Sequence, residues 1–154
     1  MMQRKDRTDY RKADSGPNLV RIGIDPGTKT GVAAYNVETK QIIACKTSGI
    51  VNVMSLITLL AYDEEFLVEI WFEDARKRKW FGNSGREKLQ GAGSIKRDCS
   101  IWEEFCNEHS IKHKMIPPRD ISTKMDKKLF AKITGWTGRT SEHSRDAAMI
   151  VFGS

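Results

Sequence analysis

Apolar and polar positions follow two different periods along the chain, and this pattern divides it into strands and helices. Short runs rich in β-branched and aromatic residues at 19–25, 31–37, 41–47, 66–74 and 111–118 predict five strands. The connection VETKQ between the second and third runs is short enough for a hairpin. We therefore expect the first three strands to form an antiparallel meander.

Apolar residues at helical spacing predict four helices between and after these strands. The segments are 51–65, 86–109, 123–136 and 141–153, and Ser141 is a suitable cap for the last of them. The apolar stripe predicted on the second helix is Ile95, Cys99, Trp102 and Cys106. The order β-β-β-α-β-α-β-α-α predicts an α/β fold, with a five-stranded mixed sheet and helices on both faces.

Length and composition are those of one ordinary globular domain, with 154 residues, 39% of them hydrophobic and 30% charged. Residues 1–18 are polar and end in DSGPN, so we expect a flexible basic arm there and a folded domain over 19–154. No apolar run approaches a membrane span, and the first residues lack a signal-peptide core. We therefore expect no membrane partner and a cytoplasmic protein, nucleoid-associated in a cell or in the host cytoplasm if viral.

Cysteine usage indicates free thiols in a reducing compartment, because Cys45, Cys99 and Cys106 include no C-x-x-C pair and are odd in number. One possible zinc pattern, C-x2-H-x3-H, is formed by Cys106, His109 and His113. It crosses a predicted helix-to-strand boundary and has no fourth ligand. We therefore expect no structural zinc.

The net charge of +6 is concentrated in two blocks. Residues 76–97 hold eight Lys or Arg against one acid, and residues 112–132 hold seven against two. Positive charge in blocks favours a polyanionic partner such as nucleic acid. The alternative is a basic face that is merely solvated.

Acids at the ends of predicted strands are the candidate catalytic groups. Asp25 closes the first strand, and Gly23 on the same face is expected to leave room for a ligand above the sheet. Glu73 ends the fourth strand. If these strands are parallel neighbours, both acids emerge at one sheet edge, where open α/β sheets bind ligands. The alternative for Asp25 alone is a turn aspartate bonded to the amides of PGTKT.

The last predicted helix can add two ligands to this edge. His143 and Asp146 are three residues apart and share a helix face, so a helix crossing the edge would bring three carboxylates and an imidazole together. A hard cation relieves the repulsion between such acids, which favours Mg²⁺, with Mn²⁺ able to substitute. Two such ions per site would activate a water and stabilise the leaving oxygen in phosphodiester hydrolysis.

Basic and aromatic residues near these acids are candidate DNA contacts. The loop RKRKWFGNSGR follows the fourth strand, and its aromatic pair suits stacking on bases, although the pair can instead pack into the core. Lys124, Lys127 and Lys128 are expected on one side of the penultimate helix, where a lysine can reach the scissile phosphate or simply face solvent. The DNA-binding candidates are Arg76, Lys77, Arg78, Lys79, Trp80, Phe81, Arg86, Lys124 and Lys128.

The motifs IGIDPGTKTGVAAYN, IWFEDA and EHSRDAAMIVF resemble the three acidic motifs of RuvC-type Holliday junction resolvases, which belong to the ribonuclease H-like superfamily. The likeness covers about residues 19–153. It implies a ribonuclease H-like fold, a homodimer with two active sites, and paired symmetric nicking of four-way DNA junctions. The residues it implies are Asp25, Glu73, His143 and Asp146 as metal ligands and Lys127 as the catalytic lysine.

Two features qualify the resemblance. The family's junction-probing aromatic falls at Arg76 in this chain, so a stacking role is not carried over by position to Trp80 and Phe81. The second predicted helix contains the small residues Gly91, Ala92 and Gly93, which permit close approach of another element. The resemblance assigns this helix to a dimer contact, whereas packing against its own sheet is equally compatible with the sequence.

Three alternative functions can be tested against the residues present in the sequence. An actin- or Hsp70-like ATPase needs two such domains and a second phosphate loop, and no P-loop motif is present, so no nucleotide cofactor is expected. A non-catalytic nucleic-acid-binding module would lack at least one acid, and none is missing. A nuclease acting on forks, flaps or RNA precursors would use the same metal site, so the sequence does not separate it from a junction resolvase.

Overall fold

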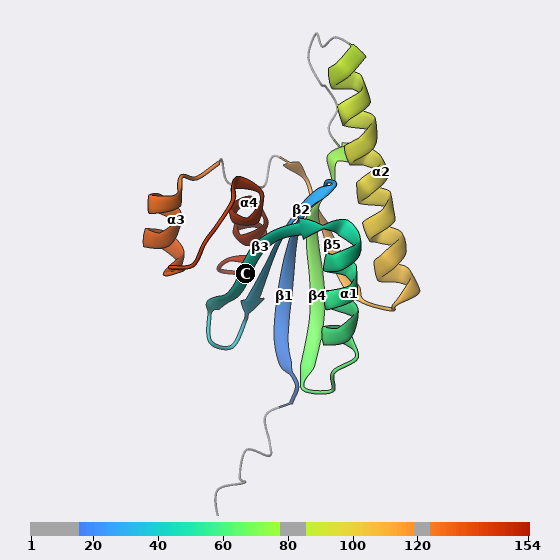
Figure 1. The fold of residues 1–154 in the computed structure, drawn as a ribbon. Coiled ribbons are helices and arrows are strands. Elements are labelled where there is room, and N and C mark those ends of the chain that lie inside the picture. The colour runs from blue at the N-terminus through green and yellow to red at the C-terminus, as the bar shows by residue number, and fades with distance from the viewer. Residues whose placement is uncertain (1–15, 78–85, 119–123) are drawn as a thin grey trace, which may run out of the picture.

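The computed structural model describes residues 16–77, 86–118 and 124–154, and a five-stranded sheet lies at its centre (Figure 1). The spatial order is β3-β2-β1-β4-β5. The first three strands pair antiparallel, whereas β4 lies parallel to both β1 and β5. The predicted mixed sheet is therefore confirmed, and the first and fourth strands are parallel neighbours, which is the condition on which the shared edge depended. The strands are β1 (Asn18–Asp25), β2 (Lys29–Asn36), β3 (Gln41–Gly49), β4 (Phe66–Glu73) and β5 (Lys112–Ile116).

Helices cover both faces of the sheet, as predicted (Figure 1). One core lies between the sheet and α1 and α2, and the other between the sheet and α3 and α4. None of the described helices combines the length and apolarity of a membrane span. The helices are α1 (Ile50–Ala61), the short 3-10 helix η1 (Ala75–Lys77), α2 (Arg86–Glu108), α3 (Lys127–Thr134) and α4 (Glu142–Val151).

The stripe predicted on α2 is only partly buried. Cys99, Trp102 and Cys106 are fully buried in the core beneath the sheet, whereas Ile95 is 41% exposed. The N-terminal half of α2 extends past the end of the sheet (Figure 1). Periodicity gives the face of a helix but not how far along the helix that face is covered.

Helix α3 begins later than predicted. Its N-cap is Asp126, whose carboxylate accepts a hydrogen bond from the Leu129 amide at 2.8 Å. Lys124 therefore lies outside the helix, in the segment that leads into it, and does not share a helix face with Lys127 and Lys128. All three side chains are exposed.

Helix α4 packs with its backbone directly against the sheet at two glycines. A Cβ atom added to Gly23 would lie 2.0 Å from the Ala147 carbonyl oxygen, and one added to Gly31 would lie 2.0 Å from that of His143. Gly23 therefore makes room for α4, and the expectation that it leaves room for a ligand was wrong. The close approach places the N-terminal turns of α4 over the carboxyl end of β1.

Candidate active site at the carboxyl ends of strands β1 and β4

The two strand-end acids lie side by side. The parallel register of β1 and β4 runs through Ile24 and Phe72, and Asp25 and Glu73 are the next residue on each strand. Phe72 is fully buried in the core beneath α1 and α2, so alternation along the strand turns Glu73 to the opposite, α4-facing side. Asp25 shares that side with Gly23. Two carboxylates thus meet at one edge of the sheet.

Helix α4 brings the histidine to this edge. Ser141 caps the helix, since its hydroxyl accepts from the Ser144 amide while the Ser144 hydroxyl accepts from the Ser141 amide. In the first turn that this cap begins, His143 Nδ1 lies 2.8 Å from Oδ2 of Asp25. Asp146, one turn further along, is partly buried near the same carboxylate.

Electrostatics at this edge show an excess of negative charge. Burial raises the pKa of Asp25, and the hydrogen bond from His143 only partly opposes this. Burial also raises the pKa of Asp146, and the negative charges of Asp25 and Glu142 raise it further. Acids placed in this way are stabilised as anions by a cation, so the site favours positively charged ligands.

The donor set fits a hard divalent ion in its chemistry. Carboxylate oxygens are the ligands that Mg²⁺ and Mn²⁺ prefer, with the imidazole as an additional nitrogen donor, and two of these carboxylates have a raised pKa that a bound cation would lower. Within the described ranges, no three His, Cys, Asp or Glu side chains together already meet the geometry of a bound metal. Asp25 and His143 contact each other instead, and an ion there would replace that contact.

Among the described lysines, Lys124 interacts electrostatically with the acids of this edge. Its ammonium group pairs with Glu142 at the start of α4, and this hydrogen bond raises the pKa of Lys124. The negative charges of Asp146 and Asp25 raise it further, which places Lys124 within electrostatic reach of the site. Arg145 holds this segment in place, because its Nε donates to the Met125 carbonyl at 2.9 Å. The family resemblance implied Lys127 as the catalytic lysine. Only the tertiary packing distinguishes Lys124 from Lys127.

Arg76 has structural partners directly after Glu73. Its guanidinium donates to both carboxylate oxygens of Asp74, at 2.8 and 3.1 Å, and to Glu103 of α2 at 2.6 Å. Asp74 is only 2% exposed. These ion pairs tie the end of β4 to α2, a role that the sequence alone did not indicate. The contact of Arg76 with DNA that the sequence suggested remains a prediction.

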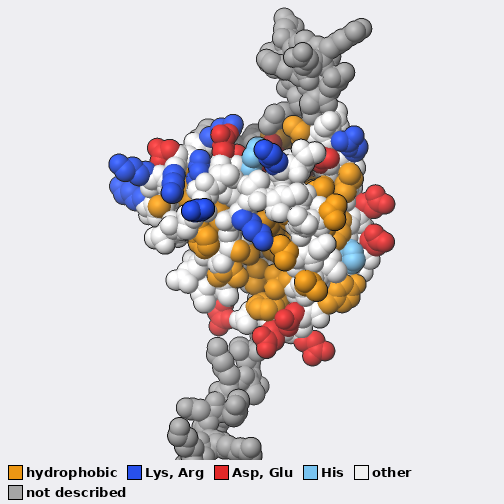
Figure 2. Space-filling model, viewed as in Figure 1, with side chains coloured by type: hydrophobic (Ala, Val, Ile, Leu, Met, Phe, Trp, Pro, Cys, Tyr) orange, Lys and Arg blue, Asp and Glu red, His pale blue; other side chains and the backbone are white. Residues whose placement is uncertain are grey.

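The remaining predicted contacts lie outside the described residues. This applies to Arg78, Lys79, Trp80 and Phe81, and to the side chains of Lys77 and Arg86, although Lys77 ends η1 and Arg86 begins α2. Lys127 and Lys128 form the first turn of α3 with exposed side chains. In the space-filling view, Lys and Arg side chains gather over α3 and the upper edge of the molecule (Figure 2). The lysines of the second basic block, 112–132, are exposed where the structure describes them.

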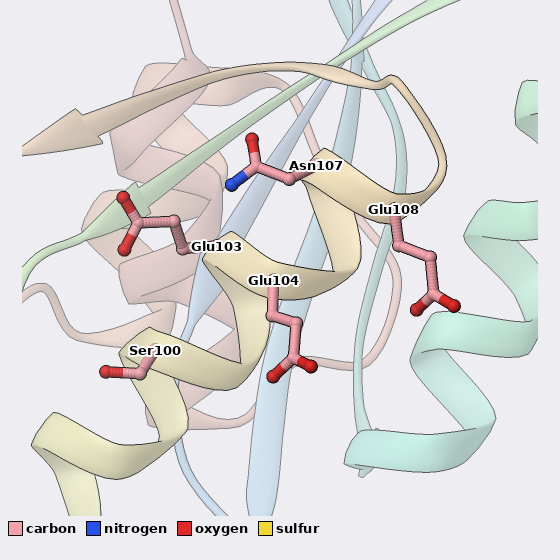
Figure 3. Close-up of a pocket in the computed structure, with 5 residues that line it drawn as sticks. All are labelled: Ser100, Glu103, Glu104, Asn107 and Glu108. Atoms are coloured by element: carbon pink, nitrogen blue, oxygen red, sulfur yellow. The ribbon is translucent and has the colours of Figure 1, made fainter.

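Two surface hollows lie away from these acids. One, of about 600 Å³, is lined by successive turns of α2 (Figure 3). Its acidic lining would repel a phosphate. The other, of about 170 Å³, lies between α1 and the sheet and has an apolar lining with a single lysine, Lys46. Neither lining suits a phosphodiester. The α2 residues are Ser100, Glu103, Glu104, Asn107 and Glu108.

Comparison with solved structures identifies the fold. The chain is similar to T. thermophilus RuvC in complex with a Holliday junction substrate, at a TM-score of 0.58 and 14% sequence identity, over 86% of this chain and 90% of that one. The fold is ribonuclease H-like. No protein-family model matches the sequence, and a comparison with curated proteins gives no match. In this fold, Asp25 and Glu73 end the neighbouring strands β1 and β4.

Proposed function

We propose that this protein is a metal-dependent endonuclease that resolves four-way DNA junctions by paired nicks. The observation that carries the proposal is the convergence of Asp25 and Glu73 on neighbouring parallel strands with His143 and Asp146 from α4. The likeness of the fold to that of RuvC, solved with a Holliday junction substrate, supports the choice of branched DNA. The basic surface over α3 supports a polyanionic partner (Figure 2).

The roles of the residues follow from their positions. Asp25, Glu73, His143 and Asp146 would hold Mg²⁺ or Mn²⁺, two ions per site, which when bound supply a nucleophilic water and charge neutralisation at the phosphate. Lys124, paired with Glu142 beside these acids, would turn to the scissile phosphate and offset its charge. The exposed Lys127 and Lys128 would hold the flanking backbone.

Paired nicking requires two sites, so we propose a homodimer formed through the N-terminal half of α2. A Cβ atom added to Gly93 would meet no other described residue within 4 Å, so the described part of the chain leaves this helix surface uncovered there. Light scattering on the purified protein measures the mass directly. A monomer at micromolar concentration, both alone and with junction DNA, would contradict the dimer.

Nuclease activity is tested with synthetic four-way junction, fork, flap and duplex DNAs and an RNA–DNA hybrid, with Mg²⁺, Mn²⁺ or excess chelator. We expect symmetric nicks in the junction only when a divalent ion is present. Asp25→Asn and Glu73→Gln should bind the junction and cut at least about 100-fold more slowly, because each loses a metal ligand. The matched control is Glu38→Gln, an exposed acid in the β2–β3 hairpin, which should cut at the wild-type rate.

The same panel separates the alternatives. Preferred cutting of forks, flaps or the RNA hybrid would keep the metal-dependent nuclease and replace its substrate. Junction binding without cutting of any substrate would instead indicate a nucleic-acid-binding module. A separate readout is thermal unfolding: Mn²⁺ should raise the melting temperature of the wild type but not of Asp25→Asn, because only the intact site binds the ion.

A further inference from the structure

The α4-facing side of the sheet carries two rows of side chains next to the candidate metal ligands. In the first row, Trp71 of β4 is the register partner of both Gly23 on β1 and Lys114 on β5. Side chains two residues apart share a face, so Trp71 lies on the same side as Glu73, one step along the strand. The second row, one step further from the site, is Arg21, Glu69 and Lys112.

The Trp71 ring holds two cations. The Arg21 guanidinium carbon lies 4.8 Å from the ring centroid, and the Lys114 ammonium nitrogen lies 4.5 Å from it. Both distances fall within the range of favourable cation–π contacts. Trp71 itself is partly buried and packs against the core beneath α4, so the ring is a fixed support.

The charges of the second row largely compensate one another, whereas the charge of Lys114, in the first row, is not compensated. Glu69 is buried and binds both Arg21, at 2.9 Å, and Lys112, at 2.6 Å. These two hydrogen bonds outweigh the effect of burial and lower the pKa of Glu69. Lys114 is exposed, and no carboxylate in the described part of the chain pairs with it. Its ammonium group is held in place by an aromatic ring and available to an anion.

We propose that Lys114, positioned by Trp71, binds the phosphate next to the scissile phosphate on the DNA strand that is cut. This inference rests on the proposed nuclease function. The step from Glu73 to Trp71 along β4 is about 6.6 Å, on the order of the distance between successive phosphates of a strand. A lysine suits this role because it contacts phosphate as a compact point charge. Trp71 is a positioning residue, since the cations already occupy its ring.

The first test is the salt dependence of binding to a labelled four-way junction, measured in Ca²⁺ so that no cutting occurs. Lys114→Ala should bind about 3–10-fold more weakly and lower the slope of log K against log salt by about 0.9, the value for one lost phosphate contact. The matched control is Lys46→Ala, which removes a lysine from the opposite face of the same sheet and should leave affinity and slope unchanged. Lys114→Arg should retain the slope.

Trp71→Leu tests the positioning role. We expect it to weaken binding about as much as Lys114→Ala, and the double variant to be no weaker than either single one. Thermal unfolding confirms that each variant is folded. Additive losses in the double variant would show that Trp71 contacts DNA independently and would overturn the positioning role.

The second test replaces single phosphates. Once the wild-type cut is mapped, junctions carrying a neutral methylphosphonate one position 5′ or 3′ of it are compared. At one of the two positions, the methylphosphonate should lower the affinity of the wild type. The same replacement should cause no further loss of affinity in Lys114→Ala. If Lys114→Ala still responds like the wild type at both, this inference fails while the nuclease function stands. If the wild type cuts no nucleic acid, the proposed function fails, and this inference fails with it.

Discussion

His143 Nδ1 lies 2.8 Å from Oδ2 of Asp25, although 118 residues separate the two along the chain. The contact depends on how closely α4 approaches the sheet, because the carbonyl of His143 occupies the space where a side chain on Gly31 would stand. A backbone feature of β2 therefore determines the geometry of a side-chain pair between β1 and α4.

Substitution of Gly31 by alanine should damage both the fold and the site. The added Cβ would lie 2.0 Å from the His143 carbonyl oxygen, so α4 must shift away from the sheet. We expect a loss of about 1–3 kcal/mol in the free energy of unfolding, together with weaker Mn²⁺ binding by calorimetry. The matched control is Gly49→Ala, because a Cβ atom at Gly49 would meet no atom of the other described residues within 4 Å and its φ is −66°. Equal stability of Gly31→Ala and Gly49→Ala would contradict the close packing.

Asp146→Asn should stabilise the metal-free protein at neutral pH. The pKa of Asp146 is raised above 3.8 by burial and then by the charge of Asp25, so its ionisation opposes folding. The free-energy cost of ionising Asp146 is fully present at pH values above its pKa in the folded protein. It is absent at pH values below its pKa in the unfolded chain. We expect a gain of about 2–4 °C in melting temperature at pH 7, corresponding to about 1 kcal/mol, which disappears near pH 3.5.

The melting temperatures of Asp146→Asn and the wild type should also be compared in saturating Mn²⁺. The ion should stabilise the wild type more than the variant and so reverse their order, because the carboxylate is then a ligand. Glu38→Gln, on the exposed hairpin, should follow the wild type in both scans. A variant less stable than the wild type in chelator at pH 7 would contradict the expected sign of the effect.

Lys124→Ala should slow cleavage more than Lys127→Ala. Lys124 lies beside Glu142 and within electrostatic reach of Asp25, whereas Lys127 begins α3 with an exposed side chain. We expect the cleavage rate constant of Lys124→Ala in single-turnover assays to be about 10- to 100-fold lower, with junction affinity changed less than 5-fold. Lys127→Ala should mainly raise KM. The reverse order would restore Lys127 as the catalytic lysine.

Arg76→Met should destabilise the protein, because it leaves the buried carboxylate of Asp74 without its guanidinium partner. We expect a loss of about 2–3 kcal/mol in urea unfolding. The double variant Asp74→Asn, Arg76→Met should recover part of this loss, since the buried charge is gone. Arg139→Met, at an exposed arginine between α3 and α4, should change stability by less than about 0.5 kcal/mol. Unchanged stability of Arg76→Met would leave DNA contact as its main role.

The strands and helices could be predicted from local pattern because alternation and helical spacing are properties of neighbouring residues. The strand ending at Asp25 and the one ending at Glu73 were placed within one residue of their actual starts, and Ser141 was correctly expected to cap α4. The sequence left the parallel pairing of these two strands as a condition, and the register of the sheet meets it and brings the two acids together. Acids at strand ends are therefore visible in the sequence itself.

Only the tertiary structure decided what stands above and beside those acids. Gly23 receives the backbone of α4. Lys124 lies within electrostatic reach of Asp25 and Asp146, in the segment before α3, because the helix starts at Lys127, four residues later than predicted. Trp71 meets both Arg21 and Lys114 only because β4 pairs with β1 on one side and β5 on the other. Contacts of this kind depend on which elements become neighbours, and that is a property of the packed sheet and its helices rather than of any segment.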